Sequence, residues 1–412
     1  MQNFYCEPMS PSRRAVMGAA GALFASAFIP KWAVAAASGR DARLVVIVLR
    51  GALDGLGAVA PLGDPDYAGL HGDLSLSLSG AKPALPLDSF FAVHPEMPNF
   101  ARLFKAGQAS VVHATATNYR NRSHFDGQDV LESGQPSPGK TQSGWLNRLI
   151  GAIPKGDRVA PVGALGVGAI PPLVVRGPAP VLGWAPPTIQ PATEDLASRV
   201  LAMYGTQDKG LAGALSAGVT TDTMARAQGM GAPQAARGAA DPVGMRQAAE
   251  GAARLIATPE GPRIAALAFE GWDTHANEGG ATGQLANRLG GLDQSIAAFE
   301  KILGAAWKDT AVMVVTEFGR TAKVNGTLGT DHGEGTVAFL AGGAIKGGKV
   351  IADWPGLSEK ALYEGRDLKP TTDLRAVTKG IVSDLFGVSA SALGNDVFPD
   401  TADLTPTKDL IA

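Results

Sequence analysis

Short apolar runs without polar alternation recur along the chain and predict buried β-strands. Continuous runs of this kind are typical of strands covered on both faces, as in a parallel sheet. Each run is followed by a polar loop that contains glycine. The predicted strands span residues 44–49, 110–114, 264–269, 311–316 and 337–341.

Between these runs, apolar residues recur at the three- and four-residue spacing of amphipathic helices. Helices that alternate with buried strands predict an α/β fold: a doubly wound, mostly parallel sheet with helices on both faces. The predicted helices span residues 98–105, 145–153, 193–204, 242–256, 284–303 and 373–386.

Two segments depart from this alternation. Residues 205–240 are rich in Ala, Gly, Met and Gln, with weak periodicity, and we expect a small helical insertion or a lid there. Residues 161–191 contain many prolines, so we expect irregular strands, in the form of a hairpin at a sheet edge.

The N-terminus has the order of a removable export signal. Arg13-Arg14 precedes an uncharged Ala/Gly-rich stretch, and small residues follow at 33–37. The stretch is too short and too poor in Leu and Ile to span a bilayer. We therefore expect residues 1–37 to be a twin-arginine signal peptide, with the twin-arginine translocase as partner during export. Residues 38–412 would then form one periplasmic α/β domain without a stable membrane anchor.

The charge balance and the cysteine content of the chain exclude some classes of protein. The chain has 36 Lys and Arg against 38 Asp and Glu, a formal net charge of −2, so it lacks the basic footprint of a nucleic-acid-binding protein. Its one cysteine, Cys6, lies in the expected leader, which leaves no disulfide for the mature chain. Stability must therefore come from packing or from bound metal.

The residues directly after the predicted strands carry the candidate chemistry, because ligands of open parallel sheets bind at the carboxyl ends of strands. Three of the six histidines lie in these loops, each within two residues of an aspartate. Imidazole and carboxylate groups both coordinate divalent ions, so their recurrence predicts a metal site. The pairs are His124 with Asp126, His275 with Asp273, and His332 with Asp331.

The loop after the second predicted strand also contains arginines. Arg120 and Arg122 flank Asn121 and precede Ser123, and two guanidinium groups can bind a tetrahedral anion. Ser123 is placed either as a nucleophile or as a helix N-cap, and both interpretations stay open. Arg320, which follows Glu317, either binds an anion or pairs with that glutamate.

Other residues are assigned packing roles. His71 and His94 are expected at the surface or in structural contacts, and His113, within a predicted strand, is expected to be a core histidine. Trp272 is expected to pack in the core, although its neighbour Asp273 would also allow it to line the site.

Taken in order, the strand-end motifs resemble the bacterial family known as domain of unknown function 1501, which belongs to the alkaline phosphatase and sulfatase superfamily. The resemblance extends over essentially the whole mature chain. The matching segments are LRGALDG at 49–55, NRSHFD at 121–126, GWDTH at 271–275, TEFGRT at 316–321 and DHG at 331–333.

The resemblance implies an alkaline phosphatase-like domain with a two-metal hydrolase plan. Asp54 would hold one metal, Ser123 would be the nucleophile, and Asp273, His275 and His332 would hold the other metal.

The chain has Glu317-Phe318 where the superfamily usually has Asp-His. We therefore expect Glu317 and Asp331 to complete the ligand set, and His124 to act as a ligand or proton donor.

The expected activity is hydrolysis of a small phosphate or sulfate ester in the periplasm. Ser123 would attack, while Arg122 or Arg320 would bind the non-bridging oxygens. Mixed nitrogen and oxygen ligands favour zinc, with manganese, magnesium and calcium as alternatives. Two other hypotheses stay open: a hydrolase in which water replaces Ser123, and a non-catalytic envelope binding or assembly module on the same fold.

Overall fold

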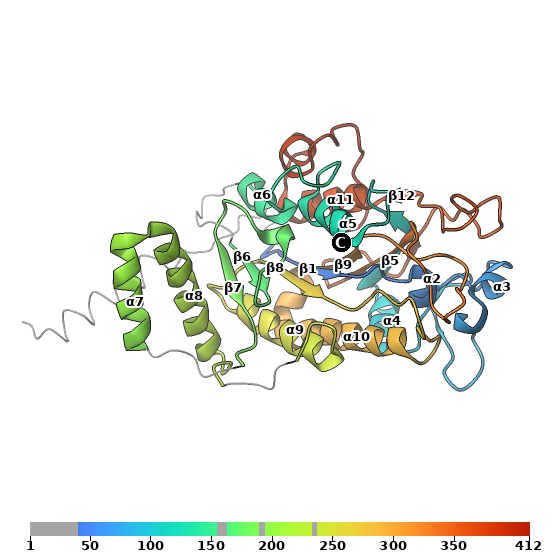
Figure 1. Cartoon of the computed structure of the whole chain (residues 1–412), viewed down its shortest axis with the longest axis horizontal. Coiled ribbons are helices and arrows are strands. Elements are labelled where there is room, and N and C mark those ends of the chain that lie inside the picture. The colour runs from blue at the N-terminus through green and yellow to red at the C-terminus, as the bar shows by residue number, and fades with distance from the viewer. Residues whose placement is uncertain (1–39, 155–162, 189–193, 233–236) are drawn as a thin grey trace, which may run out of the picture.

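The computed structural model describes residues 40–154, 163–188, 194–232 and 237–412 (Figure 1). The expected signal peptide at 1–37 lies outside these residues and stays a prediction. Within the described ranges, no helix combines the length and apolar character that a membrane span requires.

A nine-stranded sheet runs through the centre of the described chain (Figure 1). All five strands predicted from apolar runs are confirmed. The strands are β1 (Arg43–Leu49), β5 (Ala109–Ala116), β6 (Ala164–Val167), β7 (Val181–Trp184), β8 (Ile264–Phe269), β9 (Thr310–Thr316), β10 (Thr336–Ala341), β11 (Val350–Ile351) and β12 (Thr372–Asp373). Their order is β11-β5-β10-β9-β1-β8-β6-β7, with β12 beside β5.

One strand of this sheet runs against the others. β1 pairs in parallel with β8 and β9, whereas β10 is antiparallel to both β5 and β9. The expectation that residues 337–341 belong to a parallel run is therefore wrong. Because β10 is reversed, it begins at the edge of the sheet where β9 ends. Residues 317–335 thus remain at the edge reached by the loops that follow β1, β5 and β8.

The proline-rich segment also differs from expectation. It forms β6 and β7 at the sheet edge, but the two strands are parallel, so the predicted hairpin is wrong. The chain between them contains the 3-10 turn η2 (Leu173–Val175), and it returns to the end of the sheet where β6 began, because the two strands are parallel.

Helices cover both faces of the sheet, as predicted (Figure 1). Val45, Ile47 and Leu49 of β1 face one core cluster, and the alternate residues Leu44 and Val46 face another. The first cluster includes residues of α4, α9 and α10, and the second includes residues of α6 and α11. The main helices are α4 (Pro98–Lys105), α5 (His124–Ser133), α6 (Trp145–Ala152), α7 (Glu194–Gln207), α8 (Lys209–Ala227), α9 (Pro242–Ala257), α10 (Gln284–Leu303) and α11 (Leu374–Phe386).

The remaining elements are short. They are α2 (Gly55–Ala58), α3 (Tyr67–His71), α12 (Ala390–Ala392), the helical turns η1 (Gly72–Leu74), η3 (Gly304–Asp309) and η4 (Leu393–Val397), and a small sheet ordered β2-β4-β3 from β2 (Val59–Ala60), β4 (Ala92–Val93) and β3 (Leu85–Pro86).

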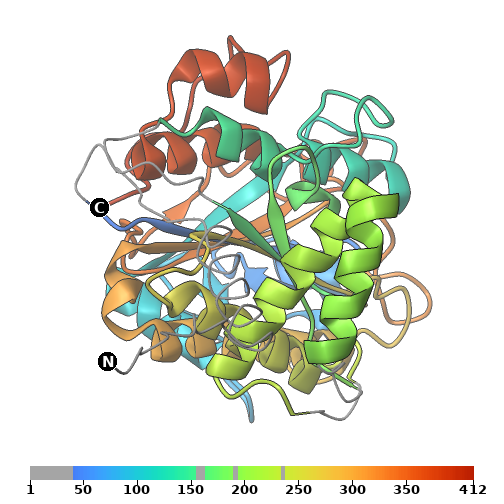
Figure 2. The same ribbon diagram turned by 90° about the vertical axis from the view of Figure 1, so that its left-hand side faces the viewer.

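The expected helical insertion is present. α7 and α8 lie side by side beyond the β7 edge of the sheet, where α8 contacts β7 (Figures 1 and 2). The end of α7 and all of α8 provide the helical part of residues 205–240. A lid function for this segment stays a prediction.

Candidate metal centre

Glycines allow the strand-end loops to approach one another closely. Gly51, with φ +118°, lies after β1, and a Cβ there would stand 2.4 Å from the backbone nitrogen of Asp273. A Cβ on Gly329 would stand 2.3 Å from the carbonyl carbon of His275. Since real Cβ atoms do not approach so closely, the contacts between these loops depend on glycine.

Three histidines surround the carboxylate of Asp273. His275 Nε2 lies 3.0 Å and His332 Nε2 3.3 Å from Asp273 Oδ1. On the other side, His124 Nε2 lies 3.4 Å from Asp273 Oδ2. Ligand atoms of His124, Asp273 and His332 all lie within 4.8 Å of one another. The loops after β5 and β8 and the loop before β10 therefore converge on one point.

The second ring nitrogen of each histidine faces a hydrogen-bond acceptor. The pairs are His124 Nδ1 with Glu317 Oε1 at 2.8 Å, His275 Nδ1 with Asp331 Oδ1 at 3.2 Å, and His332 Nδ1 with the carbonyl oxygen of Arg122 at 2.9 Å. These partners place the hydrogen on Nδ1, so each neutral ring presents a bare Nε2. Metal-binding histidines are held in this way. The sequence predicts Glu317 and Asp331 as ligands, but the structure places each behind a histidine.

The arrangement fits a bound cation. His275 Nε2 and His332 Nε2 lie 3.0 Å apart, and two lone pairs at this distance repel unless a proton or cation lies between them. His124 Nε2 is buried and has no hydrogen-bond partner. Three imidazole nitrogens and one carboxylate oxygen form a donor set typical of zinc. The four side chains could therefore hold one divalent ion.

Glu317 is a buried anchor for His124. Its Oε1 accepts hydrogen bonds from His124, from Gln128 Nε2 at 3.0 Å and from the backbone N–H of Gly51 at 2.8 Å. Burial by itself would raise the pKa of Glu317, but the hydrogen bonds from His124 and Gln128 outweigh burial and lower it. The hydrogen bond that His124 donates to Glu317 in turn raises the pKa of His124.

Arg320 is buried and bonds to Asp273 of the histidine cluster instead of facing solvent. It is 1% exposed, and its Nη1 donates to Asp273 Oδ1 at 2.6 Å. Its Nε and Nη2 donate to the hydroxyl and carbonyl oxygens of Thr330. Partial burial would raise the pKa of Asp273, but Arg320 outweighs it and lowers that pKa. Arg320 therefore positions Asp273, and the alternative pairing with Glu317 is not seen.

Arg122 is likewise surrounded by carboxylates. It lies 3.2 Å from Glu334, 2.7 Å from Glu364 and 2.8 Å from Asp367. Burial raises the pKa of Glu334 to about 7. Both arginines predicted to bind a substrate anion thus already carry carboxylate partners.

Residues 41–395 match the family described as protein of unknown function (DUF1501). The chain belongs to this family. The family resemblance predicted from the strand-end motifs is therefore confirmed. No curated protein matches the chain.

Several solved structures are similar to this DUF1501 protein at low identity. The structure titled Ps i-CgsB is 12% identical, covers 89% of this chain and 74% of its own, and has a TM-score of 0.41. Phosphonoacetate hydrolase from Sinorhizobium meliloti 1021 is 13% identical, covers 70% and 60%, and has a TM-score of 0.30. Phosphonate monoester hydrolase of Agrobacterium radiobacter is 11% identical, covers 84% and 78%, and has a TM-score of 0.28. Similarity this weak does not indicate an activity for this chain.

Ser123 lies at the start of α5, one residue before His124. Its hydroxyl does not cap the helix, so the N-cap interpretation lacks its hydrogen bond. Its backbone N–H donates to the phenol oxygen of Tyr119 at 3.3 Å. Arg122, immediately before it, has a left-handed φ of 56°, a strained conformation that directs its carbonyl group to His332. In the described ranges, no hydrogen bond joins the Ser123 hydroxyl to the histidine cluster.

Asp54 belongs to a different buried group. It caps α2 by accepting hydrogen bonds from the backbone of Leu56 and Gly57, and its Oδ2 lies 3.1 Å from His71 Nε2. Burial would raise the pKa of Asp54 and lower that of His71, but their mutual attraction outweighs burial in both. Burial and the nearby charge of Asp54 raise the pKa of Glu278 to about 8. Asp54 thus forms an ion pair with His71 close to Glu278, and its expected role as a metal ligand stays a prediction.

The other histidines show where sequence reasoning succeeded and failed. His71 and His94 are both 0% exposed, so the structural alternative is confirmed and the surface alternative is wrong: His71 lies against Asp54, and His94 Nε2 bonds to the carbonyl of Gly280. His113 is a core histidine, as predicted: its Nε2 bonds to the carbonyl of Val59 at 2.9 Å, and burial lowers its pKa to about 4. Trp272 is 0% exposed and packs in the core. No local motif marked His71, because it ends helix α3 and its partner Asp54 lies in the loop after β1.

Proposed function

We propose that this DUF1501 protein is a metal-dependent hydrolase of phosphate or sulfate esters, exported to the periplasm by the twin-arginine route. The observation that carries the proposal is the convergence of three bare Nε2 atoms on Asp273. A divalent ion, zinc first and otherwise manganese, magnesium or calcium, would neutralise the anionic ester and stabilise the charge that develops on its oxygens. His124, Asp273, His275 and His332 would hold that ion.

The surrounding residues keep this site in place while leaving it open to substrate. Glu317, Asp331 and the Arg122 carbonyl orient the imidazoles, and the side chains of Asp273 and His275 are 41% and 44% exposed. A small anionic ester can therefore reach the ligand atoms without movement of the core.

Ser123 is the proposed nucleophile, because its uncapped hydroxyl stands at the helix start beside His124. Its Oγ would attack phosphorus or sulfur, and the bond to the alcohol oxygen would break. Water would then cleave the seryl ester and restore the hydroxyl. The hydroxyl proton would pass to water, and the departing alcohol would take a proton from water.

The second candidate is a non-catalytic envelope binding or assembly module on the same fold. It is favoured by the carboxylate partners of Arg122 and Arg320, which leave these arginines less able to bind a substrate anion. In this case metal binding would stabilise the fold without turnover.

The experiment is metal analysis of the purified mature chain combined with a panel of chromogenic phosphate monoesters, phosphate diesters and sulfate esters. We expect about one metal per chain in wild type, and loss of both metal and hydrolysis in Asp273→Ala. Ser123→Ala should keep the metal and lose hydrolysis. Asp384→Asn, an exposed aspartate of α11, is the matched control and should retain both properties.

Each outcome separates the hypotheses. Metal binding with no hydrolysis across the panel would favour the binding module. Hydrolysis that survives Ser123→Ala but not Asp273→Ala would assign the attack to water. Hydrolysis that survives Asp273→Ala would refute the proposed site.

A further inference from the structure

The side chain of Ser123 does not make the usual contact of a helix N-cap. A serine at the start of a helix normally accepts a hydrogen bond from a backbone N–H of the first turn. Ser123 has the extended backbone of an N-cap residue, but its side chain makes no such bond to α5. Instead, its side chain forms a hydrogen bond with the phenol of Tyr119, and its backbone N–H donates to the same phenol oxygen at 3.3 Å.

The proton on Tyr119 sets the direction of these bonds. The phenol donates its hydrogen to Asp126 Oδ2 at 3.3 Å, so its oxygen is left to accept from Ser123. Burial raises the pKa of Tyr119, hydrogen bonds from the side chain and backbone of Ser123 oppose this rise, and the charge of Asp126 adds to it. The pKa stays above its ordinary value, so the phenol keeps its proton at neutral pH.

Tyr119 is placed firmly beside the histidine cluster. It is 6% exposed and belongs to a buried cluster with Ala52, Val130 and Phe318. Phe318 stacks on the ring of His124, with 5.0 Å between the ring centroids. A hydroxyl group that Tyr119 holds is therefore held in a defined place relative to a candidate metal ligand.

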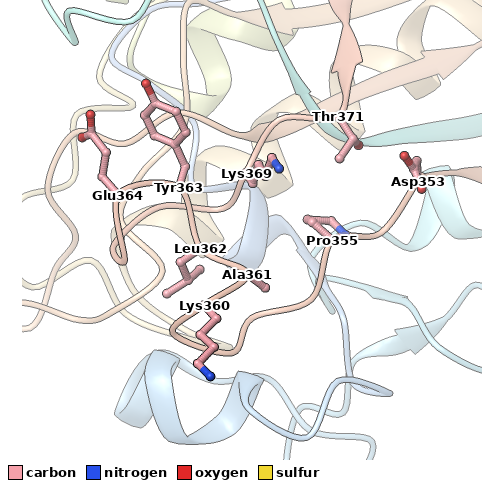
Figure 3. A pocket seen from close by; sticks show the side chains of 9 residues that line it. All are labelled: Asp353, Pro355, Lys360, Ala361, Leu362, Tyr363, Glu364, Lys369 and Thr371. Atoms are coloured by element: carbon pink, nitrogen blue, oxygen red, sulfur yellow. The ribbon is translucent and has the colours of Figure 1, made fainter.

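The residue before Ser123 is held as well. The Arg122 side chain pairs with Glu364 and Asp367, and its guanidinium carbon lies 5.9 Å from the centre of the Tyr363 ring. Tyr363 and Glu364 lie at one end of a hollow in the segment between β11 and β12 (Figure 3). These contacts support the left-handed φ of 56° at Arg122. The backbone that carries Ser123 is thus fixed on one side by Arg122 and on the other by α5.

We infer that Tyr119 is a positioning residue for the attack of Ser123 on the ester. Its phenol oxygen accepts the hydrogen of the Ser123 hydroxyl and keeps this hydroxyl out of the helix cap, so the lone pairs of Ser123 Oγ stay free for phosphorus or sulfur. Asp126 acts one step behind, because it takes the phenol hydrogen and leaves the phenol oxygen as an acceptor. The inference rests on the hydrolase function proposed above and deepens it.

The kinetic test compares zinc-loaded mature chains on para-nitrophenyl phosphate, bis(para-nitrophenyl) phosphate and para-nitrophenyl sulfate. Tyr119→Phe removes only the phenol oxygen. It should lower kcat about tenfold or more and change KM by less than about twofold, because a misplaced nucleophile slows attack but leaves ester binding intact. Asp126→Ala should lower kcat in the wild-type chain and add nothing in Tyr119→Phe, since it acts through the phenol.

Tyr67→Phe is the matched control. Tyr67 is 2% exposed, its phenol oxygen accepts from the backbone N–H of Leu76 at 3.0 Å, and its hydroxyl donates to the carbonyl of Leu56 at 3.3 Å. This variant loses the same kind of buried hydroxyl but spares the bonds of Ser123, so kcat should match wild type. Thermal unfolding and metal content, measured on each variant, separate a loss of positioning from a loss of folding or of metal.

A spectroscopic test needs no substrate. Four of the five tyrosines remain in the mature chain, since Tyr5 lies in the expected leader. With tyrosine labelled at ¹³Cζ, the NMR signal of Tyr119 is the one that disappears in Tyr119→Phe. Ser123→Ala should shift this signal, because it removes a hydrogen bond to the phenol oxygen, and should leave the other three signals in place.

The inference is overturned if hydrolysis that depends on Ser123 is unchanged in Tyr119→Phe, or if the Tyr119 signal does not move in Ser123→Ala. Either result leaves the hydrolase function in place. A wild-type chain that hydrolyses none of the probes refutes the hydrolase function, and with it the role of Tyr119 in attack. Hydrolysis that persists in Ser123→Ala also overturns the inference, because it removes the nucleophile that Tyr119 would position.

Discussion

Replacing Glu278 with glutamine tests the buried charge network behind the metal centre. Glu278 is 0% exposed, and its Oε2 accepts a hydrogen bond from Thr330, which also contacts Arg320. Burial, together with the charge of Asp54, raises its pKa from 4.5 to about 8. The folded protein therefore holds a proton on Glu278 at neutral pH, and glutamine imitates this neutral form without titrating.

The sign of the effect follows from proton binding. Below pH 4.5 the Glu278 carboxyl is protonated in both the folded and the unfolded chain. The stability that the folded chain gains by holding this proton is fully present there. Between pH 4.5 and about 8 the unfolded chain releases the proton while the folded chain keeps it. Unfolding then becomes more favourable by about 1.4 kcal/mol per pH unit. At pH 7 the accumulated loss reaches at most about 3 kcal/mol.

Urea unfolding followed by tryptophan fluorescence, with a chelator present, measures this slope. Between pH 5.5 and 7.5 the unfolding free energy of wild type should fall by up to about 3 kcal/mol relative to Glu278→Gln. The variant also places an amide N–H where Glu278 Oε1 has no partner, but this constant cost cancels in the pH difference. Glu359→Gln, at an exposed position, should follow wild type. Parallel pH curves for wild type and Glu278→Gln would refute the reasoning.

Three further changes test the supports of the site. Thr330→Val removes the hydroxyl that accepts from Arg320, and it should weaken zinc binding roughly 10-fold in chelator competition, whereas unchanged affinity would contradict this role. Glu317→Gln should lower the pKa of His124 in the metal-free protein, because the hydrogen bond that His124 donates to the Glu317 carboxylate raises it. NMR titration would show no change if the contact were absent. Zinc affinity of wild type should fall with acid, beginning at a higher pH than in Glu317→Gln, since a protonated His124 cannot bind metal. Gly51→Ala should destabilise the fold by about 1–3 kcal/mol in thermal unfolding, because its Cβ would lie 2.4 Å from a backbone nitrogen; an unshifted transition would argue against the close approach.

Much of the fold was predictable because the core is organised by burial. β1 is buried along its whole length, so its apolar run is continuous, and the same holds for β9. The predicted helix boundaries at 98–105 and 284–303 match α4 and α10 without change. The reversed direction of β10 was not predictable, because a fully buried strand has the same apolar pattern in either direction.

The site was predictable as a location but not as a set of contacts. His124, His275 and His332 each follow or precede a strand, and this order along the chain indicated convergence. The pairing of Glu317 with His124 depends on how the loop after β9 and the loop after β5 are placed in space. The spacing of residues within either loop does not determine this.

The sequence by itself determined the buried strands, the helices between them, family membership and the histidine loops, because these depend on local apolar patterns and short motifs. Tertiary structure alone decided which carboxylate faces which imidazole. In the folded chain Asp54 pairs with His71, and Arg122 and Arg320 pair with carboxylates. Asp273 lies among the Nε2 atoms of three histidines. The physical reason is that charges select partners by distance in space, and here those partners are supplied by loops far apart in the chain.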